Sequence, residues 1–300
     1  MSTVRMHADE VDVDASLVRG LLAEQFPEWA DLPIEAVFPR GTDNRLFRLG
    51  DDMVVRLPCR AGTVSTLVKE REWLPRLGPH LPLAVPVPLA LGEPGDGYAF
   101  TWSIYRWLDG ENAIDAPIAD FEQAADDLAG FLVALEQIDT SGAPPLGRTS
   151  RGAPLAALDP AVRGWIESLG AAIDGATVAT AWEEALEVPE WEGPPVWVHA
   201  DLDARNPLVR NGRLVAVVDF GTLGVGDPAC DVAVALKVLP PNARERFRNA
   251  LAVDGATWAR ARGWVLCQAL GAAAYYTPET NAVLYAEGRR WLGELGFELR

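Results

Sequence analysis

The 300-residue sequence is poor in cysteine, lysine and histidine. Its three cysteines, Cys59, Cys230 and Cys267, are odd in number and far apart, and no two form a CxxC pair. This spacing excludes a disulfide framework and a cysteine zinc site, so we expect three buried, small apolar side chains. Lys69 and Lys237 are the only lysines, and every other basic side chain is an arginine.

Long apolar runs and positive charge are also scarce. The longest runs, such as 131–135 and 214–218, are far shorter than the roughly 20 residues of a membrane helix. The net charge is −17, of which residues 108–300 carry −13, so nucleic acid and membrane surfaces are not expected as partners. A cationic small molecule is favoured. The first ten residues contain no apolar block, which predicts a protein without a signal peptide, located in the cytoplasm.

The length predicts about two domains, and the pattern changes near Trp107. Residues 1–107 combine amphipathic helices with short strands that are separated by turn signals. The helices are expected at 16–26 and 63–77, and the strands at 34–39, 45–49, 53–57 and 98–107. Residues 108–300 are mainly helical, with helices at 118–138, 155–173, 177–187, 228–238, 243–252, 256–276 and 281–295, and strand-like pieces at 196–198 and 214–219. The fold class is therefore α+β.

Two polar motifs follow the strand-like pieces of the second domain. Residues 199–206 read HADLDARN, and residues 219–221 read DFG. Phosphoryl transfer from a nucleotide needs a carboxylate that orients and deprotonates the attacking hydroxyl, and an amide and a second carboxylate that hold magnesium. Asp201 fits the first role, and Asn206 and Asp219 fit the other two. His199 is expected to orient this loop through hydrogen bonds.

These motifs, with GTDN at 41–44, VVRLP at 54–58, KEREWLPRL at 69–77, YRWLDGE at 105–111 and GVGDPACD at 224–231, resemble the aminoglycoside phosphotransferase family. They are similar also to viomycin/capreomycin-type peptide antibiotic phosphotransferases. The resemblance implies a bilobal, protein-kinase-like fold, with a small antiparallel β-rich nucleotide-binding lobe over 1–107 and a helical lobe over 108–300. It implies ATP or GTP and Mg²⁺ as cofactors, and transfer of the γ-phosphoryl group to a hydroxyl of a small cationic acceptor.

The sequence departs from the family pattern at three positions. Ala200 and Asp203 stand where the family usually has glycine and a second histidine, and Arg56 stands where nucleotide kinases usually have a lysine that contacts the phosphates. Arginine supplies the same charge with a different geometry. Because Glu70 lies nearer the apolar stripe of its helix than Glu72, Glu70 is the expected partner of Arg56.

No GxGxxG precedes VVRLP, so the turn 40–44 is expected to cover the phosphates through Gly41, Thr42 and Asn44. The purine is expected against backbone groups from Tyr105 to Trp107, a contact that does not distinguish ATP from GTP.

The acceptor is expected to be a small molecule rather than a protein, because Gly226-Asp227-Pro228 closely follows DFG and no APE motif is present. Asp227 and Pro228 are typical of a helix start, and Asp227 and Asp231 are interpreted mainly as structural, with Asp231 kept as a candidate acceptor residue. Asp203 either binds ammonium groups of the acceptor or faces solvent. Glu279 and Glu287 are further acceptor candidates.

Two alternatives to this function stay open, and a third is disfavoured. The enzyme could phosphorylate an ordinary metabolite, such as an amino sugar or a choline- or homoserine-like compound. It could also be a non-catalytic nucleotide-binding relative. A phosphatase with an aspartate nucleophile is disfavoured, since its two acidic blocks would be separated by a large part of an α/β domain.

Overall fold

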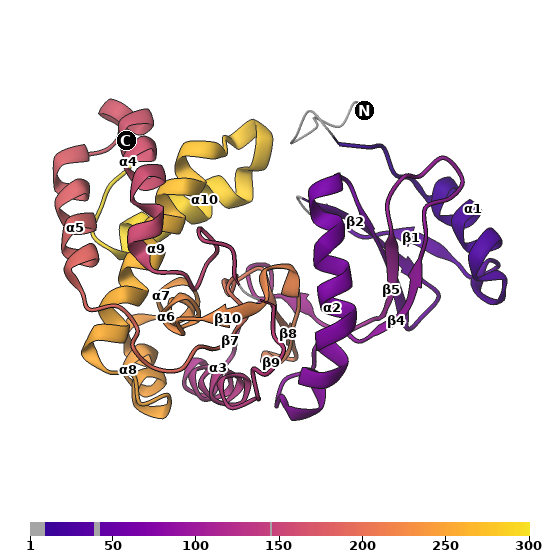
Figure 1. Cartoon of the computed structure of the whole chain (residues 1–300), viewed down its shortest axis with the longest axis horizontal. Coiled ribbons are helices and arrows are strands. Elements are labelled where there is room, and N and C mark those ends of the chain that lie inside the picture. The colour runs from indigo at the N-terminus through magenta and orange to yellow at the C-terminus, as the bar shows by residue number, and fades with distance from the viewer. Residues whose placement is uncertain (1–9, 39–42, 145) are drawn as a thin grey trace. The chain divides into compact units, whose positions relative to one another are not determined.

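The computed structural model describes residues 10–38, 43–144 and 146–300. The chain divides into two compact units (Figure 1). Unit 1 contains the described residues up to Gly110 together with Val215–Gly221, and unit 2 contains Glu111–Leu214 and Thr222–Arg300. The DFG segment, residues 219–221, follows the loop 199–206 in the sequence but belongs to unit 1. No helix within the described part of the chain has the length and apolar character needed to cross a membrane.

Unit 1 is built on an antiparallel sheet of order β1-β2-β3-β5-β4. Its strands are β1 (Ile34–Ala36), β2 (Asn44–Leu49), β3 (Met53–Pro58), β4 (Pro88–Gly92) and β5 (Trp102–Arg106). The predicted meander is confirmed, whereas β4 was not expected, because prolines surround it. As the last strand in the order, β4 tolerates Pro88 at its first position, where no inner ladder bond is lost.

Two helices belong to unit 1: α1 (Ala15–Gln25) and α2 (Val64–Leu77). The Asp14 carboxylate caps α1 by accepting from the N–H groups of Ser16 and Leu17. Buried side chains of α1 share one apolar core with β2, β3 and β5, namely Val18, Leu21, Leu22, Phe47, Leu49, Val55, Leu57, Trp102 and Ile104. In β3 the alternation of side chains sends Val55 and Leu57 into this core and Arg56 to the opposite face.

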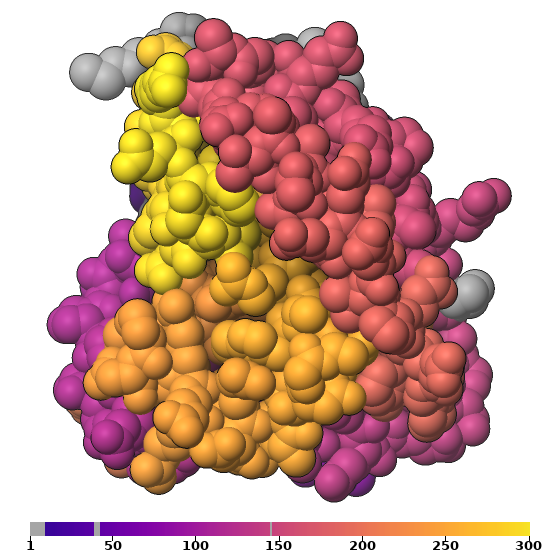
Figure 2. Space-filling view, turned by 90° about the vertical axis from the view of Figure 1, so that its left-hand side faces the viewer, coloured from indigo at the N-terminus to yellow at the C-terminus, as the bar shows by residue number. Residues whose placement is uncertain are grey.

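Unit 2 is mostly helical. Its helices are α3 (Phe121–Glu136), α4 (Asp159–Leu169), α5 (Gly175–Glu187), α6 (Ala229–Val232), α7 (Val234–Val238), α8 (Pro241–Ala250), α9 (Gly255–Tyr275) and α10 (Pro278–Glu294). Helix α9 packs against α4, α5, α6 and α10, so apolar side chains cover most of its circumference. In Figure 2, the yellow surface of α10 and the rose surface of α4 and α5 meet above the orange surface of α8 and α9.

Short strands frame the polar loop of unit 2. β7 (Val196–Val198) pairs with β10 (Gly224–Gly226), and β6 (Glu111–Asn112) pairs with β8 (Pro207–Arg210), all antiparallel. A tight turn at Asn211-Gly212, with both φ angles positive, then leads into β9 (Arg213–Val217). The sequence prediction missed β8, although Asn-Gly is a strong hairpin signal. The predicted strand 214–219 ends two residues early, and the predicted helix 228–238 is divided into α6 and α7.

Candidate active site

The loop 199–206 is fastened by a buried carboxylate from α6. Asp231 accepts hydrogen bonds from the backbone N–H of His199 at 2.6 Å and of Ala200 at 2.7 Å. Burial raises the pKa of Asp231. Because both oxygens bind the loop backbone, Asp231 is a structural anchor and not an open acceptor-binding group.

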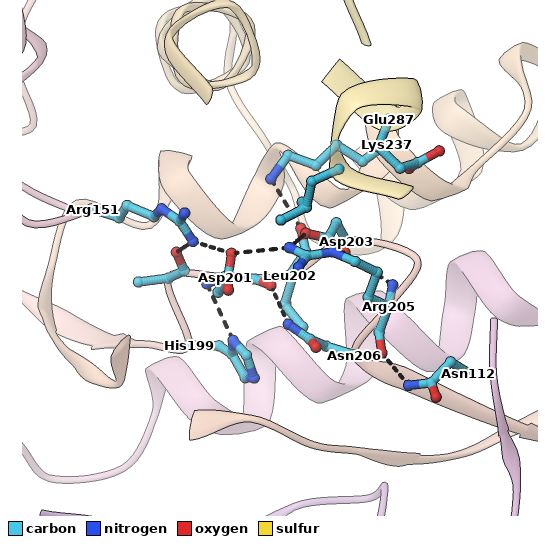
Figure 3. A network of polar contacts seen from close by, with 12 residues as sticks. Asn112, Arg151, His199, Asp201, Leu202, Asp203, Arg205, Asn206, Lys237 and Glu287 are labelled. Carbon is cyan, nitrogen blue, oxygen red and sulfur yellow. Dashed lines mark hydrogen bonds and ion pairs between the residues drawn. The ribbon is translucent and has the colours of Figure 1, made fainter. Parts of the chain in front are cut away.

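Asp201 and Asn206 lie at the two ends of one closed loop (Figure 3). The Asn206 Nδ2 donates to the backbone oxygen of Asp201 at 2.7 Å, and the Asp201 N–H donates to His199 Nδ1 at 3.2 Å. The histidine thus orients the loop through a hydrogen bond, as predicted. Since the amide nitrogen of Asn206 is engaged inside the loop, its oxygen is the atom suited to bind a cation.

Two arginines flank the carboxylate of Asp201, whose side chain is 19% exposed. Arg151 forms an ion pair with Asp201 Oδ1 and also donates to the backbone oxygen of Ala200 at 3.2 Å. Arg205 Nη2 lies 3.9 Å from the same Oδ1. The prediction missed Arg151, because it lies fifty positions before Asp201 in a loop without a motif.

Asp203 does not face solvent, so the solvent alternative was wrong, and its pairing with Arg205 disfavours the other alternative, an ammonium-binding role. Its side chain is 1% exposed and accepts from Arg205 Nε at 2.9 Å, Arg205 Nη2 at 2.6 Å and the Arg205 N–H at 2.9 Å. Burial opposes its charge, but Arg205 lowers the pKa of Asp203 below its ordinary value. Asp203 therefore holds Arg205 in place beside Asp201.

A buried lysine supports the same loop from behind. Lys237 in α7 donates from Nζ to the backbone oxygen of Leu202 at 3.1 Å (Figure 3). The same nitrogen lies 5.2 Å from the centre of a Trp291 ring. Burial lowers the pKa of Lys237 to about 8. The two-lysine composition gave no sign of this role.

Ala200 has φ 67°, a left-handed conformation that glycine adopts without steric cost. This conformation explains why the family usually has glycine at the position of Ala200. In this chain the strain at Ala200 is held by its buried surroundings and by the bond from its N–H to Asp231.

Unit 1 contains a second polar group, centred on Arg56. Arg56 Nη1 donates to Glu70 at 2.8 and 2.9 Å, and the Tyr105 hydroxyl donates to Glu70 Oε2 at 2.6 Å. The predicted pairing of Arg56 with Glu70 is thus present. Burial disfavours the guanidinium charge, but the carboxylates of Glu70 and Asp219 raise the pKa of Arg56 above its ordinary value.

Asn44 and Asp219 approach the same guanidinium. The Asn44 amide, with its oxygen turned to Arg56, accepts at 3.2 Å from Nε and 3.0 Å from Nη2, and Asp219 Oδ1 lies 3.4 Å from Nη2. Asp219 has φ 65°, and 55% of its side chain is exposed. Lys69 donates to the backbone oxygen of Gly221 at 2.9 Å. Unit 1 therefore presents a guanidinium and an accessible carboxylate together.

Of the other nucleotide candidates, the structure describes Tyr105 and Trp107. Gly41 and Thr42 lie outside the described residues. The Tyr105 side chain is buried against Glu70, and the Trp107 N–H donates to the Asp52 oxygen at 2.7 Å. The expected purine contact with backbone groups of 105–107 must therefore use groups other than the Trp107 N–H.

The remaining acidic candidates have internal partners or stand apart. Asp227 forms a buried ion pair with Arg260 at 2.7 Å and also accepts from the Ala229 N–H, which starts α6. Glu287 is buried and paired with Arg290 at 2.6 Å. Glu279 is exposed in the first turn of α10. The buried ion pair of Glu287 disfavours its predicted role as an open acceptor-binding group.

The described residues contain no cluster of three or more His, Cys, Asp or Glu side chains that could hold a metal ion. Asp201 and Asn206 are in unit 2, and Asp219 is in unit 1. Each unit thus carries part of the predicted catalytic set.

Comparison with known proteins gives the family of this chain and a similar sequence. The "Phosphotransferase enzyme family" matches residues 35–264, well over half of the chain. Hygromycin-B 4-O-kinase of Escherichia coli is 29% identical over 238 residues, which span 74% of this chain and 66% of that kinase, just under two thirds of its length.

Two solved structures are similar in fold. The GDP and kanamycin complex of APH(2")-IIIa has a TM-score of 0.71 at 20% identity and covers 91% of this chain and 96% of its own. The macrolide 2'-phosphotransferase MphH of Brachybacterium faecium has a TM-score of 0.64 at 22% identity and covers 93% of this chain and 97% of its own. The fold is thus the mixed α+β, protein-kinase-like fold that the resemblance implied. The chain belongs to the phosphotransferase enzyme family.

Proposed function

We propose that the enzyme transfers the γ-phosphoryl group of ATP or GTP to a hydroxyl of a small cationic acceptor, such as an aminoglycoside or a related basic antibiotic. The observation that carries the proposal is the closed loop 199–206: Asp231 holds the backbone of His199 and Ala200, and the Asn206 side chain donates to the backbone oxygen of Asp201. Phosphoryl transfer depends mainly on positioning and charge stabilisation, and a rigid loop supplies the positioning.

Each residue has a distinct part in this reaction. Asp201 accepts the hydrogen bond of the acceptor hydroxyl, orients its oxygen toward the phosphorus and takes its proton. Arg56, held by Glu70, binds oxygens of the non-transferred phosphates. Loss of Asp201 is expected to affect the reaction of the acceptor, and loss of Arg56 is expected to affect binding of the nucleotide.

The residues also fit a magnesium ion. The Asn206 oxygen and the exposed carboxylate of Asp219 are oxygen ligands of the kind that Mg²⁺ prefers when it is bound together with phosphates. Such an ion would neutralise charge on the phosphates. Because Asp219 supplies the one carboxylate of this proposed pair of ligands, we expect magnesium to enter with the nucleotide.

Two observations support a cationic acceptor. Residues 108–300 carry 15 basic and 28 acidic residues, and the resulting field attracts cations. The similar kinase from Escherichia coli is named for hygromycin B, and one similar structure contains kanamycin.

A kinase of an ordinary metabolite is the second candidate. The groups nearest the Asp201 carboxylate are the guanidinium groups of Arg151 and Arg205, which favour a neutral or acidic substituent beside the reacting hydroxyl. A homoserine-like compound, which carries a carboxylate, meets that requirement.

Mass spectrometry distinguishes these acceptors. The purified enzyme is incubated with magnesium, ATP or GTP, and a panel of aminoglycosides, basic peptide antibiotics, macrolides, amino sugars, choline and homoserine. We expect one cationic antibiotic to gain a single phosphoryl group, and Asp201→Asn enzyme to leave it unmodified. A product only from a metabolite would select the second candidate, and no product from any compound would refute phosphoryl transfer to these classes.

A further inference from the structure

Arg151, in the loop before α4, contacts the carboxylate of Asp201, the proposed catalytic group. Arg151 Nη1 reaches both the backbone oxygen of Ala200, at 3.2 Å, and the Asp201 Oδ1 (Figure 3). One guanidinium thus contacts two consecutive residues of the catalytic loop. A contact of this kind fixes the orientation of the carboxylate as well as its position.

The backbone that carries Arg151 is itself fixed. Gly152 has φ 92°, and its oxygen accepts from the Asp227 N–H at 2.9 Å. A Cβ at this glycine would lie 3.1 Å from a Leu146 methyl group and 3.3 Å from a Val198 methyl group. Val198 is the last residue of β7, which leads into the loop 199–206. The backbone next to Arg151 is therefore packed beside that loop.

The guanidinium groups of Arg151 and Arg205 both lie near the same carboxylate oxygen of Asp201, Oδ1. Arg205 Nη2 lies 3.9 Å from Oδ1 and is held by the buried Asp203. Oδ1 therefore faces guanidinium groups, and Oδ2 is the oxygen suited to accept a hydrogen bond from a substrate hydroxyl.

We propose that Arg151 is a positioning residue for Asp201: it holds Oδ1, so that Oδ2 is oriented to receive the acceptor hydroxyl. This role rests on the proposed function. It predicts that removal of Arg151 slows the transfer step, while nucleotide binding, which uses Arg56, is retained. A displacement of about 1 Å at a reacting group can lower the rate by roughly a hundredfold.

The first test compares Arg151→Ala, Arg151→Gln and Arg151→Lys with wild-type enzyme. We expect kcat to fall by about tenfold to a hundredfold for the alanine and glutamine variants, and by less for lysine, with the KM for nucleotide within about twofold of wild type. Guanidinium ion at a non-denaturing millimolar concentration should restore part of the kcat of Arg151→Ala. A residue that only stabilised the fold would not respond in this way.

Arg163→Ala is the matched control. Arg163 in α4 is likewise an arginine in ion pairs, with the carboxylates of Asp159 and Glu183, but its side chain is 47% exposed and lies outside the loop 199–206. Its kcat should equal that of wild type, with or without guanidinium. Circular dichroism establishes that each variant is folded; if Arg151→Ala is not, the glutamine and lysine variants give the result.

A double-mutant cycle tests whether Arg151 acts through Asp201. In an Asp201→Ala background, Arg151→Ala should cause no further loss of kcat. A full additional loss, or wild-type kcat in Arg151→Ala and Arg151→Gln, would overturn the positioning role while the proposed function stands. Wild-type enzyme without any phosphoryl transfer would overturn the proposed function, and this role with it.

Discussion

Replacing Lys237 with methionine removes a buried charge behind the catalytic loop. The carboxylates of Asp203 and Asp201 favour this charge, whereas Arg151, Arg205 and burial disfavour it, and burial is the largest influence. The result is a pKa of about 8 for Lys237 in the native state, against an ordinary value of 10.5. We expect this difference to make the stability of the wild-type protein depend on pH.

The sign follows from proton binding. Below pH 8 the lysine is protonated in the folded and the unfolded state, and the cost of burying its charge is fully present. Between about pH 8 and 10.5 the unfolded chain binds the proton that the native state has released, so the free energy of unfolding rises with pH. At about 1.4 kcal/mol for each pKa unit, the gain from pH 7 to pH 10 is about 2 to 3 kcal/mol.

Urea unfolding at pH 7, 8.5 and 10 measures this effect as the difference between wild type and Lys237→Met. The difference should change in favour of wild type by about 2 to 3 kcal/mol as the pH rises. Leu236→Met, a neutral exchange at the neighbouring buried position, should show a constant difference from wild type. A Lys237→Met difference that stays constant or falls with pH would refute the reasoning.

Three further predictions concern charged groups. Burial and Asp231 raise the pKa of Glu136 from 4.5 to about 7, so the wild type loses stability as the pH rises through this range, and Glu136→Gln should be more stable than wild type by about 3 kcal/mol at pH 8 but not at pH 4.5; equal differences at both pH values would contradict this. Asp231→Asn should lower the free energy of unfolding by about 3 kcal/mol in urea, because one backbone N–H of the catalytic loop loses its acceptor; unchanged stability would refute the anchor. Arg56→Ala should weaken ATP binding about tenfold or more in calorimetric titration, with Arg56→Lys in between; unchanged affinity would assign the phosphates to another residue.

Local patterns predicted most of the secondary structure. The apolar stripe of α2 and the turn signals of the meander are properties of neighbouring residues, and so are the HADLDARN and DFG motifs. The pairing of Arg56 with Glu70 could be predicted as well, because helix geometry placed only one of the two candidate glutamates near the packed face. Strand β8 was missed although its Asn-Gly turn is a local signal.

Contacts between distant segments could not be predicted in the same way. Arg151 meets Asp201, and Lys237 meets Leu202, only because loops and helices far apart in the sequence pack together. The sequence did not decide whether Asp203 faces solvent or binds the acceptor, for the same reason: its burial depends on packing that no local pattern encodes. The orienting role of His199, which lies inside the motif, was therefore predictable, whereas the contacts of Arg151 and Lys237 with the motif were not.

The central claim is that Asp201 receives the acceptor hydroxyl during phosphoryl transfer. The most direct measurement is the rate of phosphoryl transfer by Asp201→Asn enzyme, with saturating ATP, magnesium and the acceptor identified by mass spectrometry, alongside ATP affinity. The account predicts a rate lower by at least about a hundredfold, with ATP affinity close to that of wild type. A variant that transfers phosphoryl groups at the wild-type rate would contradict it.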